Sequence, residues 1–209
     1  MPTSAAASRQ AGYHHGDLPN ALKAAAAEVI TEKGPAGFSL REVARRAGVS
    51  HAAPAHHFGD TTGLLTALAV DAFRLLDEAM TVAAAAAEGP ADRLARVGRA
   101  YVEVGLTNPA HLDIVFRPDL VNTSDPDYSE WGERAYGHLV DALEAIKQEM
   151  NPDLDVDDAA RLCWSTVQGL IVLHPGMSSR DQRHGAGAEE IGDLAERFCQ
   201  LLLVGLVSR

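Results

Sequence analysis

The sequence predicts an all-α protein with a small N-terminal domain and a larger helical body. Apolar residues recur at intervals of three and four along most of the 209-residue chain. No stretch of useful length alternates apolar and polar residues as a β-strand does. Cap signals and Gly-Pro or Asn-Pro pairs divide the chain into pieces of helical length. We therefore expect a three-helix domain at residues 13–60, joined by a long helix to a helical domain at residues 61–209.

The chain begins with residues 1–12, rich in Ala, Ser and Gly, which we expect to form a mobile arm. Asp17 is placed to cap a first helix that runs to about Lys33, where Gly34 and Pro35 stop it. The apolar residues of this helix share one face, which predicts that they are buried: Leu22, Ala25, Ala26, Val29 and Ile30.

Residues 39–58 have the pattern of two short helices joined by a tight turn. Gly48 supplies the left-handed backbone that ends the first helix, and Ser50 is placed to cap the second. Pro54 removes a backbone donor, so the second helix is predicted to be short and distorted. This is the pattern of a helix-turn-helix, whose second helix can enter the DNA major groove. A short helical hairpin with no DNA-binding role would show it too.

Two further signals mark the start of the first helix of this pair. Ser39 and Glu42 have the spacing of a capping box, in which each side chain satisfies a free backbone N–H of the other residue. Phe38 and Val43 have the spacing of a hydrophobic staple.

The body is predicted to contain a long helix and several shorter ones. Asp60 is placed to cap a helix that runs to about Ala87 and joins the two domains. Further helices are expected at residues 91–107, 109–118, 129–150, 155–173 and 188–207, with a loop from His174 to Gly187. The apolar surface of the last helix is wider than one stripe, which predicts a second partner surface for it.

Charge is distributed unevenly between the two parts. The whole chain carries a net charge of −11. Residues 1–60 hold six Lys or Arg and five Asp or Glu, a net charge of +1, so residues 61–209 carry −12. A mildly positive segment on an acidic body is the asymmetry expected of a small DNA reader attached to a domain that does not bind DNA.

Several function classes find no support in the sequence. No apolar run reaches the ~20 residues that span a bilayer, and no secretory signal is visible, so we expect a cytoplasmic protein without a membrane anchor. No hydrolase, P-loop or dinucleotide motif occurs, and the His14-His15 and His56-His57 pairs lack the neighbours of a metal site. We therefore predict no catalytic residue, no metal and no cofactor.

The two cysteines do not form a disulfide framework. Cys163 and Cys199 each lie in a helical pattern and are predicted to be small buried apolar residues in a reducing compartment. A redox-sensing pair is the alternative, which would need an exposed and electropositive setting.

The segments that flank the helix-turn-helix carry a resemblance. Tyr13-His14-His15-Gly16-Asp17-Leu18 precedes it, and Phe58-Gly59-Asp60-Thr61-Thr62-Gly63-Leu64-Leu65 follows it. With these residues the chain resembles the TetR (tetracycline-repressor) family of bacterial transcriptional regulators. The resemblance implies a homodimer formed through the last two helices. It also implies a repressor that leaves its operator when a small molecule binds.

The resemblance also indicates which residues contact DNA. Arg41 and His51 stand where base or phosphate contacts are usually made, and the whole expected set is Tyr13, His14, Ser39, Arg41, Ser50, His51, Ala52, Ala55 and His56. His57 is expected to pack against the first helix. Ala55 and Thr61 depart from the family pattern, which usually has an aromatic residue and a Lys there.

A second resemblance lies in the body. Trp164-Ser-Thr-Val-Gln168-Gly169 resembles the Trp-x-x-Val-His-Gly segment of one TetR C-terminal subfamily, with Gln in place of His. It implies an apolar ligand pocket. The expected pocket residues are Tyr101, Phe116, Trp131, His138, Trp164 and Gln168, and ordinary core packing is the alternative for each. Four glycines inside helical patterns predict close packing or space for a ligand: Gly98, Gly105, Gly137 and Gly169.

The function predicted from these observations is DNA-binding transcriptional regulation. Because Ala55 and Thr61 remove expected phosphate contacts, a helical ligand- or partner-binding protein that has lost DNA binding is the alternative.

Overall fold

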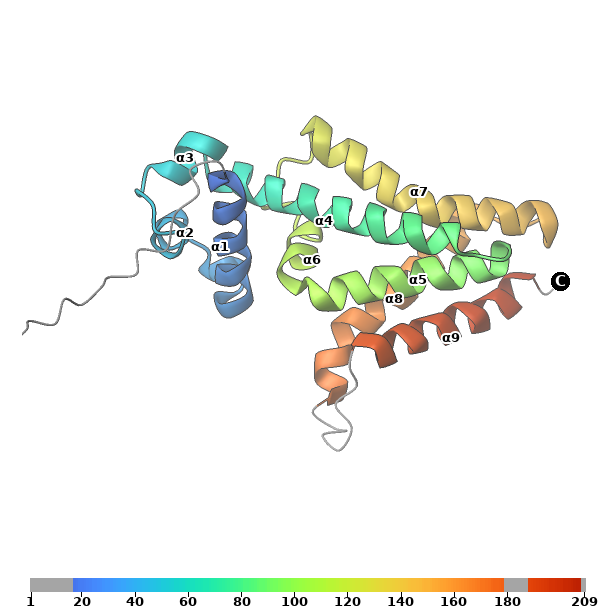
Figure 1. Ribbon diagram of the computed structural model, residues 1–209. Coiled ribbons are helices and arrows are strands. Elements are labelled where there is room, and N and C mark those ends of the chain that lie inside the picture. Colours follow the sequence, from blue (N-terminus) through green and yellow to red (C-terminus); the bar gives the residue numbers. More distant parts are fainter. Residues whose placement is uncertain (1–16, 179–187, 208–209) are drawn as a thin grey trace, which may run out of the picture.

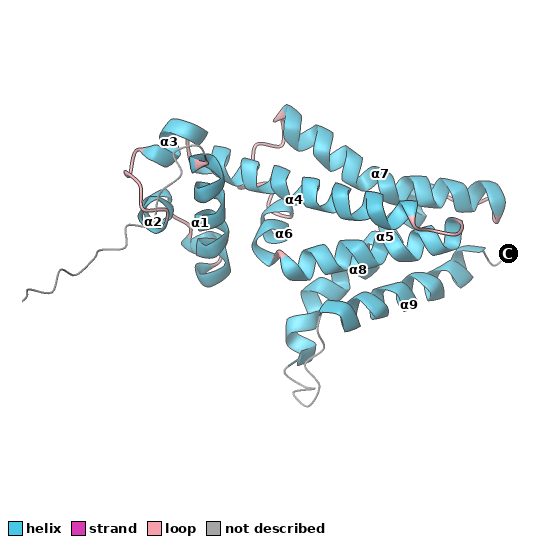
Figure 2. Ribbon diagram, in the orientation of Figure 1, coloured by secondary structure: helices cyan, strands magenta, loops and turns pink. Residues whose placement is uncertain are grey.

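The computed structural model describes residues 17–178 and 188–207, and within these ranges the chain is helical with no strand (Figure 2). The helices are α1 (Leu18–Lys33), α2 (Leu40–Arg46), α3 (Ala53–Phe58), α4 (Thr61–Ala85), α5 (Pro90–Thr107), α6 (Pro109–Val115), α7 (Pro126–Glu149), α8 (Val156–Ser178) and α9 (Ala188–Val207), with a short 3-10 helix at Pro35–Gly37. The predicted all-α fold is confirmed.

The short helices α1, α2 and α3 form a group at one end of the molecule (Figure 1). The long helix α4 begins beside this group and runs through the body, where it packs against α5, α6 and α7. Helix α5 lies at the centre of the body and contacts α4, α7, α8 and α9. The shorter α6 packs against both α1 and α4, so it bridges the two parts of the molecule.

The N-terminal helices share a small core of their own. Leu22, Ala25, Ala26, Val29 and Ile30 of α1 are buried, as predicted. Leu22 and Val29 pack in one cluster with Val43 of α2 and Leu64 of α4. Phe38 contacts the same cluster, as expected of a hydrophobic staple. The first turn of α4 is therefore part of this core, which fixes its direction relative to the three helices.

Gly48 ends α2 as predicted. Its φ is +69°, in the left-handed region. The Val49 N–H donates to the Ala44 carbonyl at 3.0 Å, and the Gly48 N–H donates to the Arg45 carbonyl at 3.3 Å. These two bonds form a Schellman motif, which satisfies carbonyl groups that the end of a helix leaves free.

Three predicted side-chain caps are wrong, and the first is Asp17, whose side chain makes no cap bond at the start of α1. Ser39 stands at the N-cap position of α2 but makes no side-chain cap bond. The carboxylate of Glu42, which forms the other half of the expected capping box, is held by Arg45 and Arg46. Ser50 does not cap α3 with its side chain either, since α3 begins only at Ala53. The Ser50 carbonyl accepts from the Ala53 N–H at 3.0 Å and closes the turn that precedes the helix.

Helix boundaries in the body differ from the predicted ones by a few residues. The Asp60 side chain caps α4 as predicted and accepts from the Gly63 N–H at 2.9 Å. Asp125 accepts from the Tyr128 N–H at 3.2 Å, so α7 begins earlier than the expected residue 129. Helix α8 continues past the predicted end at residue 173 to Ser178 and includes Pro175. A proline this close to the end of a helix removes only one backbone hydrogen bond. Residues 174–178 are thus helical, and the remainder of the expected loop lies outside the described residues.

Within the described ranges, no helix combines the length and the apolar character that crossing a bilayer requires.

Candidate functional site

The surface formed by α2, α3 and the turn between them is exposed. Of the residues expected to contact DNA, Ser39, Arg41, Ser50, His51, Ala52, Ala55 and His56 are all exposed, whereas Pro54 is buried beneath them. Tyr13 and His14 lie outside the described residues. We call this surface, residues 39–57, the reading face.

Pro54 shapes the reading face without breaking α3. It stands in the first turn of the helix, where its missing N–H would have had no partner within the helix in any case. The helix is nevertheless short, with six residues, as the proline predicted. His57 is exposed and does not pack against α1 as expected, because its ring extends beside His56 at the end of the short helix.

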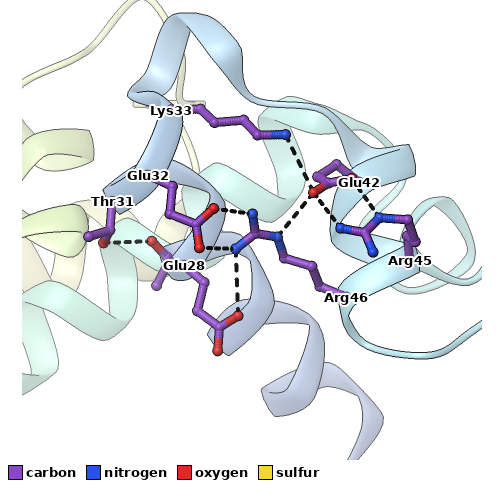
Figure 3. A network of polar contacts seen from close by, with 8 residues as sticks. Glu28, Thr31, Glu32, Lys33, Glu42, Arg45 and Arg46 are labelled. Carbon is purple, nitrogen blue, oxygen red and sulfur yellow. Dashed lines mark hydrogen bonds and ion pairs between the residues drawn. The ribbon is translucent and has the colours of Figure 1, made fainter.

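An ionic network holds α2 against α1 (Figure 3). Arg46 of α2 bonds the carboxylate of Glu32 in α1, with Nη1 to Oε1 at 2.8 Å, and its Nε lies 3.2 Å from Glu42 Oε1. Glu42 also bonds Arg45 at 2.8 Å, and Lys33 lies 3.4 Å from the same carboxylate oxygen. The network therefore fixes how α2, and with it the reading face, is held on α1.

The arginines keep the carboxylates of Glu32 and Glu42 ionised. Hydrogen bonds from Arg45 and then Arg46 hold the pKa of Glu42 far below its usual value of 4.5. A hydrogen bond from Arg46 lowers the pKa of Glu32 as well. Two of the three arginines of α2 are thus engaged by carboxylates.

Arg41 differs from Arg45 and Arg46. It is exposed in the first turn of α2, and no carboxylate of the described residues lies within ion-pair distance of it. An arginine without a carboxylate partner is free to bond a phosphate or a guanine edge. His51 is exposed in the turn ahead of α3 and offers a second side chain that can donate to or accept from DNA.

The body contains a cavity of about 360 Å³ enclosed by α4, α5, α6, α7, α8 and α9. Most of the lining side chains are apolar, for example Leu76, Met80, Leu112 and Val167. No Lys, Arg, His, Asp or Glu side chain is among the described lining residues. Such a mainly apolar cavity with few polar groups is typical of a small-molecule site.

Four of the six residues predicted for a ligand pocket come together at this cavity. Tyr101, Phe116 and Trp164 line it. Gln168 lies behind Tyr101 and accepts a hydrogen bond from the Tyr101 hydroxyl at 2.7 Å. The Trp164 Nε1–H donates to the same hydroxyl oxygen at 3.2 Å. We call Tyr101, Trp164 and Gln168 the polar trio.

The other two predicted residues, Trp131 and His138, lie outside the cavity lining. The Trp131 ring is flanked by the guanidinium groups of Arg74 and Arg134, whose carbons lie 5.0 and 4.4 Å from its centre. The Nε2 atom of His138 lies 3.0 Å from Asp77 Oδ1. Both side chains thus belong to the polar contact between α4 and α7, since their positions on α7 turn them towards charged residues of α4.

Two tyrosines of the cavity lining were not predicted from the sequence. Tyr128 and Tyr136 of α7 both line the cavity, with Gly132 midway between them. A Cβ at Gly132 would lie 3.4 Å from the Phe73 ring, so the glycine lets α4 and α7 approach closely. Aromatic residues four positions on either side of a glycine share one helix face, and this spacing was the signal available in the sequence.

Both cysteines are buried and line the cavity. Burial raises the pKa of the Cys163 thiol to about 11 and that of Cys199 to about 12. Protonated thiols are poor nucleophiles, so these residues contribute neutral surface, which favours the predicted role of buried apolar residues over redox sensing.

Two of the four glycines singled out in the sequence lie at close helix contacts. A Cβ at Gly98 would lie 2.6 Å from the sulfur of Cys199, and one at Gly105 would lie 2.6 Å from Ile171 Cδ1. Gly137 and Gly169 have open space where a Cβ would lie.

The outer side of α8 and α9 exposes apolar side chains. Val172, Leu173 and Leu201 are 64%, 61% and 70% exposed, and Leu162 and Val204 are exposed on the same two helices. Single exposed apolar residues are ordinary, but a group of this kind on adjoining helices indicates an interaction surface.

Comparison with protein families agrees with this architecture. Residues 22–68 match the model described as bacterial regulatory proteins, tetR family. Residues 94–202, just over half of the chain, match the model described as tetracyclin repressor-like, C-terminal domain. The chain belongs to the TetR family. It is accordingly a DNA-binding transcriptional regulator with a helix-turn-helix domain and a helical C-terminal domain.

Solved structures share this fold along nearly the whole chain. A protein of unknown function from Rhodococcus sp. RHA1 is 29% identical, with a TM-score of 0.75, and the match covers 95% of this chain and 100% of that one. The ketosteroid transcriptional regulator KstR2 of Mycobacterium tuberculosis is 20% identical, with a TM-score of 0.69 and coverage of 93% and 97%.

A third similar structure contains a ligand. The transcriptional regulator FadR from Bacillus subtilis, in complex with stearoyl-CoA, is 22% identical, with a TM-score of 0.66 and coverage of 89% and 98%. The search of curated proteins found no match.

Proposed function

We propose that this TetR-family regulator is a homodimeric repressor that binds a pseudo-palindromic operator and leaves it when a small molecule occupies the cavity. The observation that carries the proposal is the position of α6 between the cavity and the DNA-binding domain. Leu112 and Val115 of α6 line the cavity, while Ala110 and Ile114 pack in a cluster with Ile30 of α1.

This position provides a route from ligand to DNA. A ligand that fits better when α6 is displaced would move α1, and with it the reading face. The ligand can shift the equilibrium only by the difference between its affinities for the two arrangements. The salt bridge between Lys23 of α1 and Asp71 of α4, at 2.5 Å, couples the first helix to α4 as well.

For DNA, we propose that Arg41 and His51 contact bases or phosphates, and that Tyr13 and His14 reach the backbone from the arm. The exposure of the reading face supports this assignment. Ala55 and Thr61 stand where the family usually supplies an aromatic residue and a Lys, so the protein should make fewer phosphate contacts than is common. Loss of DNA binding is therefore the competing function.

For dimerisation, we propose that α8 and α9 pair with their copies in a four-helix bundle. The exposed apolar side chains of both helices support it, since burying them against a second copy removes apolar area from water. Two reading faces would then contact half-sites one DNA turn apart, about 34 Å. Such a regulator would act in the bacterial cytoplasm. It would not catalyse a reaction.

For the effector, we propose a small molecule held by Tyr101, Phe116, Trp164 and Gln168. The likeness of the segment from Trp164 to Gly169 to the Trp-x-x-Val-His-Gly subfamily belongs to this proposal. Trp131 and His138 are not assigned to the ligand, because they contact α4 residues outside the cavity lining.

The test is fluorescence anisotropy of the full chain on operator DNA selected from a randomised pool, at about 50 and about 200 mM salt. We expect saturable binding that scrambled DNA does not compete away. The slope of log affinity against log salt should be shallow, because each phosphate contact contributes about 0.9 to it. If no sequence is enriched from the pool, the proposed repressor function is overturned, and the alternative of a ligand-binding protein that has lost DNA binding is favoured.

A further inference from the structure

The polar trio determines which hydrogen bonds the cavity can still offer. A tyrosine hydroxyl has one donor and two lone pairs. The Tyr101 hydroxyl donates to Gln168 Oε1 at 2.7 Å and accepts from Trp164 Nε1–H at 3.2 Å. Its donor and one lone pair are therefore in use, and so is the Trp164 donor. What remains at this position is a single lone pair, which can only accept a hydrogen bond.

The rest of the cavity offers nothing to a charged group. The described lining residues include no cationic and no anionic side chain. Burial raises the pKa of Tyr101 to about 12, so its hydroxyl is neutral at physiological pH. The thiols of Cys163 and Cys199 are protonated for the same reason. A carboxylate or phosphate inside this cavity would lose its hydration and find no cationic side chain to pair with among the described lining residues.

The size and the mouth of the cavity favour a small ligand that is mainly apolar. Its volume of about 360 Å³ is at the low end of the range of roughly 300–1,000 Å³ typical of ligand pockets. The Trp164 ring lies 5.9 Å from the Phe116 ring and 5.7 Å from the Tyr136 ring, centre to centre. Trp164 and Tyr136 are each 39% exposed, so these rings form the outer edge of the cavity, where apolar surface meets solvent.

We propose that the cavity selects an uncharged, mainly apolar molecule with one hydroxyl group, which donates its hydrogen bond to the Tyr101 hydroxyl oxygen. Alcohols should bind better than ketones of the same size, because a ketone can only accept. Carboxylates should bind least well. This inference rests on the proposed effector function and adds the chemical class of the effector.

The test uses three eight-carbon probes: n-octanol, hexyl methyl ketone and octanoate. The chain has two tryptophans, so a Trp131→Phe background leaves Trp164 as the fluorescence reporter inside the cavity. Binding to the full chain is followed by Trp164 fluorescence and by calorimetry. We expect n-octanol to bind about tenfold more tightly than the ketone, the effect of about one net hydrogen bond, and octanoate to bind more weakly than both.

Three variants locate the preference. Tyr101→Phe should abolish the advantage of the alcohol. Tyr136→Phe removes the hydroxyl of a second lining tyrosine and tests whether that group takes part: loss of the advantage in Tyr136→Phe and not in Tyr101→Phe would overturn the assignment to Tyr101. Gln168→Met removes the acceptor that holds the Tyr101 hydrogen. The hydroxyl could then donate into the cavity, and the preference should shift towards the ketone. The third variant keeps the test valid even if Tyr101→Phe fails to fold.

The outcomes separate this inference from the proposed function. If all three probes bind in the cavity and cause release of the operator, but n-octanol binds no more tightly than the ketone, the proposed chemical class is wrong and the effector function stands. If octanoate binds most tightly, the class is wrong as well. If no probe binds the cavity while operator binding is intact, both the class and the effector role of the cavity are overturned, and DNA binding remains.

Discussion

In the domain formed by α1, α2 and α3, charged side chains lie at the surface and bond one another, whereas the polar side chains that line the cavity of the body are neutral. Arg46 joins α2 to α1 through Glu32 and also bonds Glu42 of its own helix. In the body, Tyr101 is 8% exposed and is held by Gln168 and Trp164. The first arrangement fixes an outer surface, and the second leaves one lone pair of a cavity-lining tyrosine without a partner among these bonds.

The two regions also differ in how complete their packing is. The small domain has a continuous core and tight backbone junctions, so it can present the reading face in one orientation. The body keeps a cavity inside and exposes apolar side chains outside, which protein packing normally avoids. The difference agrees with the proposed function, in which a ligand fills the cavity of the body and a second copy of the chain covers its exposed apolar side chains.

The largest effect should come from placing charge on the exposed apolar side of the body. Val172→Glu together with Leu201→Glu would remove apolar burial worth about 2 kcal/mol for each side chain and bury carboxylates, in both subunits at once. We expect dissociation to monomers with the helical content retained, measured by light scattering and circular dichroism. Leu75→Glu on α4, outside the proposed interface, should leave the dimer intact. A dimer that persists in the double variant would contradict the assignment of α8 and α9.

The junction between the reading face and α4 should be the next most sensitive position. A Cβ at Gly63 would lie 1.9 Å from the Phe58 carbonyl oxygen, and backbone must move to admit it. Overpacking of this kind costs about 3 kcal/mol, so Gly63→Ala should lower the free energy of unfolding in urea and weaken DNA binding.

Gly137→Ala is the matched control for that substitution. Nothing lies within 4 Å of a Cβ built there, and the residue is inside α7. It should stabilise the protein slightly, by up to about 1 kcal/mol, because alanine favours the helix. Equal stability losses in the two variants would show that the Gly63 contact has no special role.

Substitutions on the reading face should weaken DNA binding without changing the stability of the fold. Arg41→Ala and His51→Ala should each weaken operator binding by roughly 1–3 kcal/mol if they contact bases, with unchanged thermal unfolding because both side chains are exposed. Lys147→Ala, near the far end of α7, is the control. Anisotropy titrations that give the wild-type affinity and sequence preference for both variants would remove these two residues from the interface.

The ionic network should give a smaller effect that depends on pH. The pKa of Glu42 is lowered in the folded protein from its usual 4.5, so its contribution to stability is present above that pH and is lost as the pH falls towards the folded value. Glu42→Gln should therefore be less stable than wild type near about pH 7, and the difference should shrink progressively as the pH is lowered below 4.5, measured by melting temperature. Glu130→Gln, an exposed position on α7 with no ion pair among the described residues, should show no such convergence.

Sequence patterns predicted the elements of the fold because their causes are local. The helical spacing of Leu22, Val29 and Ile30 fixed the buried face of α1, and Gly48 and Asp60 marked helix ends through bonds to residues at most five positions away. The expected capping box of Ser39 and Glu42 fails in part for a reason that is not local. Glu42 is bonded by Arg46, whose guanidinium is aligned by a glutamate of another helix.

The cavity could be predicted only in part. Helical spacing marks Tyr101, Trp164 and Trp131 alike as members of apolar helix faces. In the structure, however, Tyr101 and Trp164 line the cavity, whereas Trp131 lies between two arginines. Which face of α7 turns inward depends on how α4 and α7 approach each other at Gly132, a contact between residues far apart in the chain.

The sequence by itself determined the helices, the helix-turn-helix and the family. Each follows from residues close together in the chain, where capping, helical periodicity and the preference of glycine for positive φ act. Only the tertiary structure decided which side chains enclose the cavity and that a single lone pair of Tyr101 remains unused there. The reason is physical: a hydrogen bond between α5 and α8 depends on the distance and rotation of two packed helices, which no local pattern encodes.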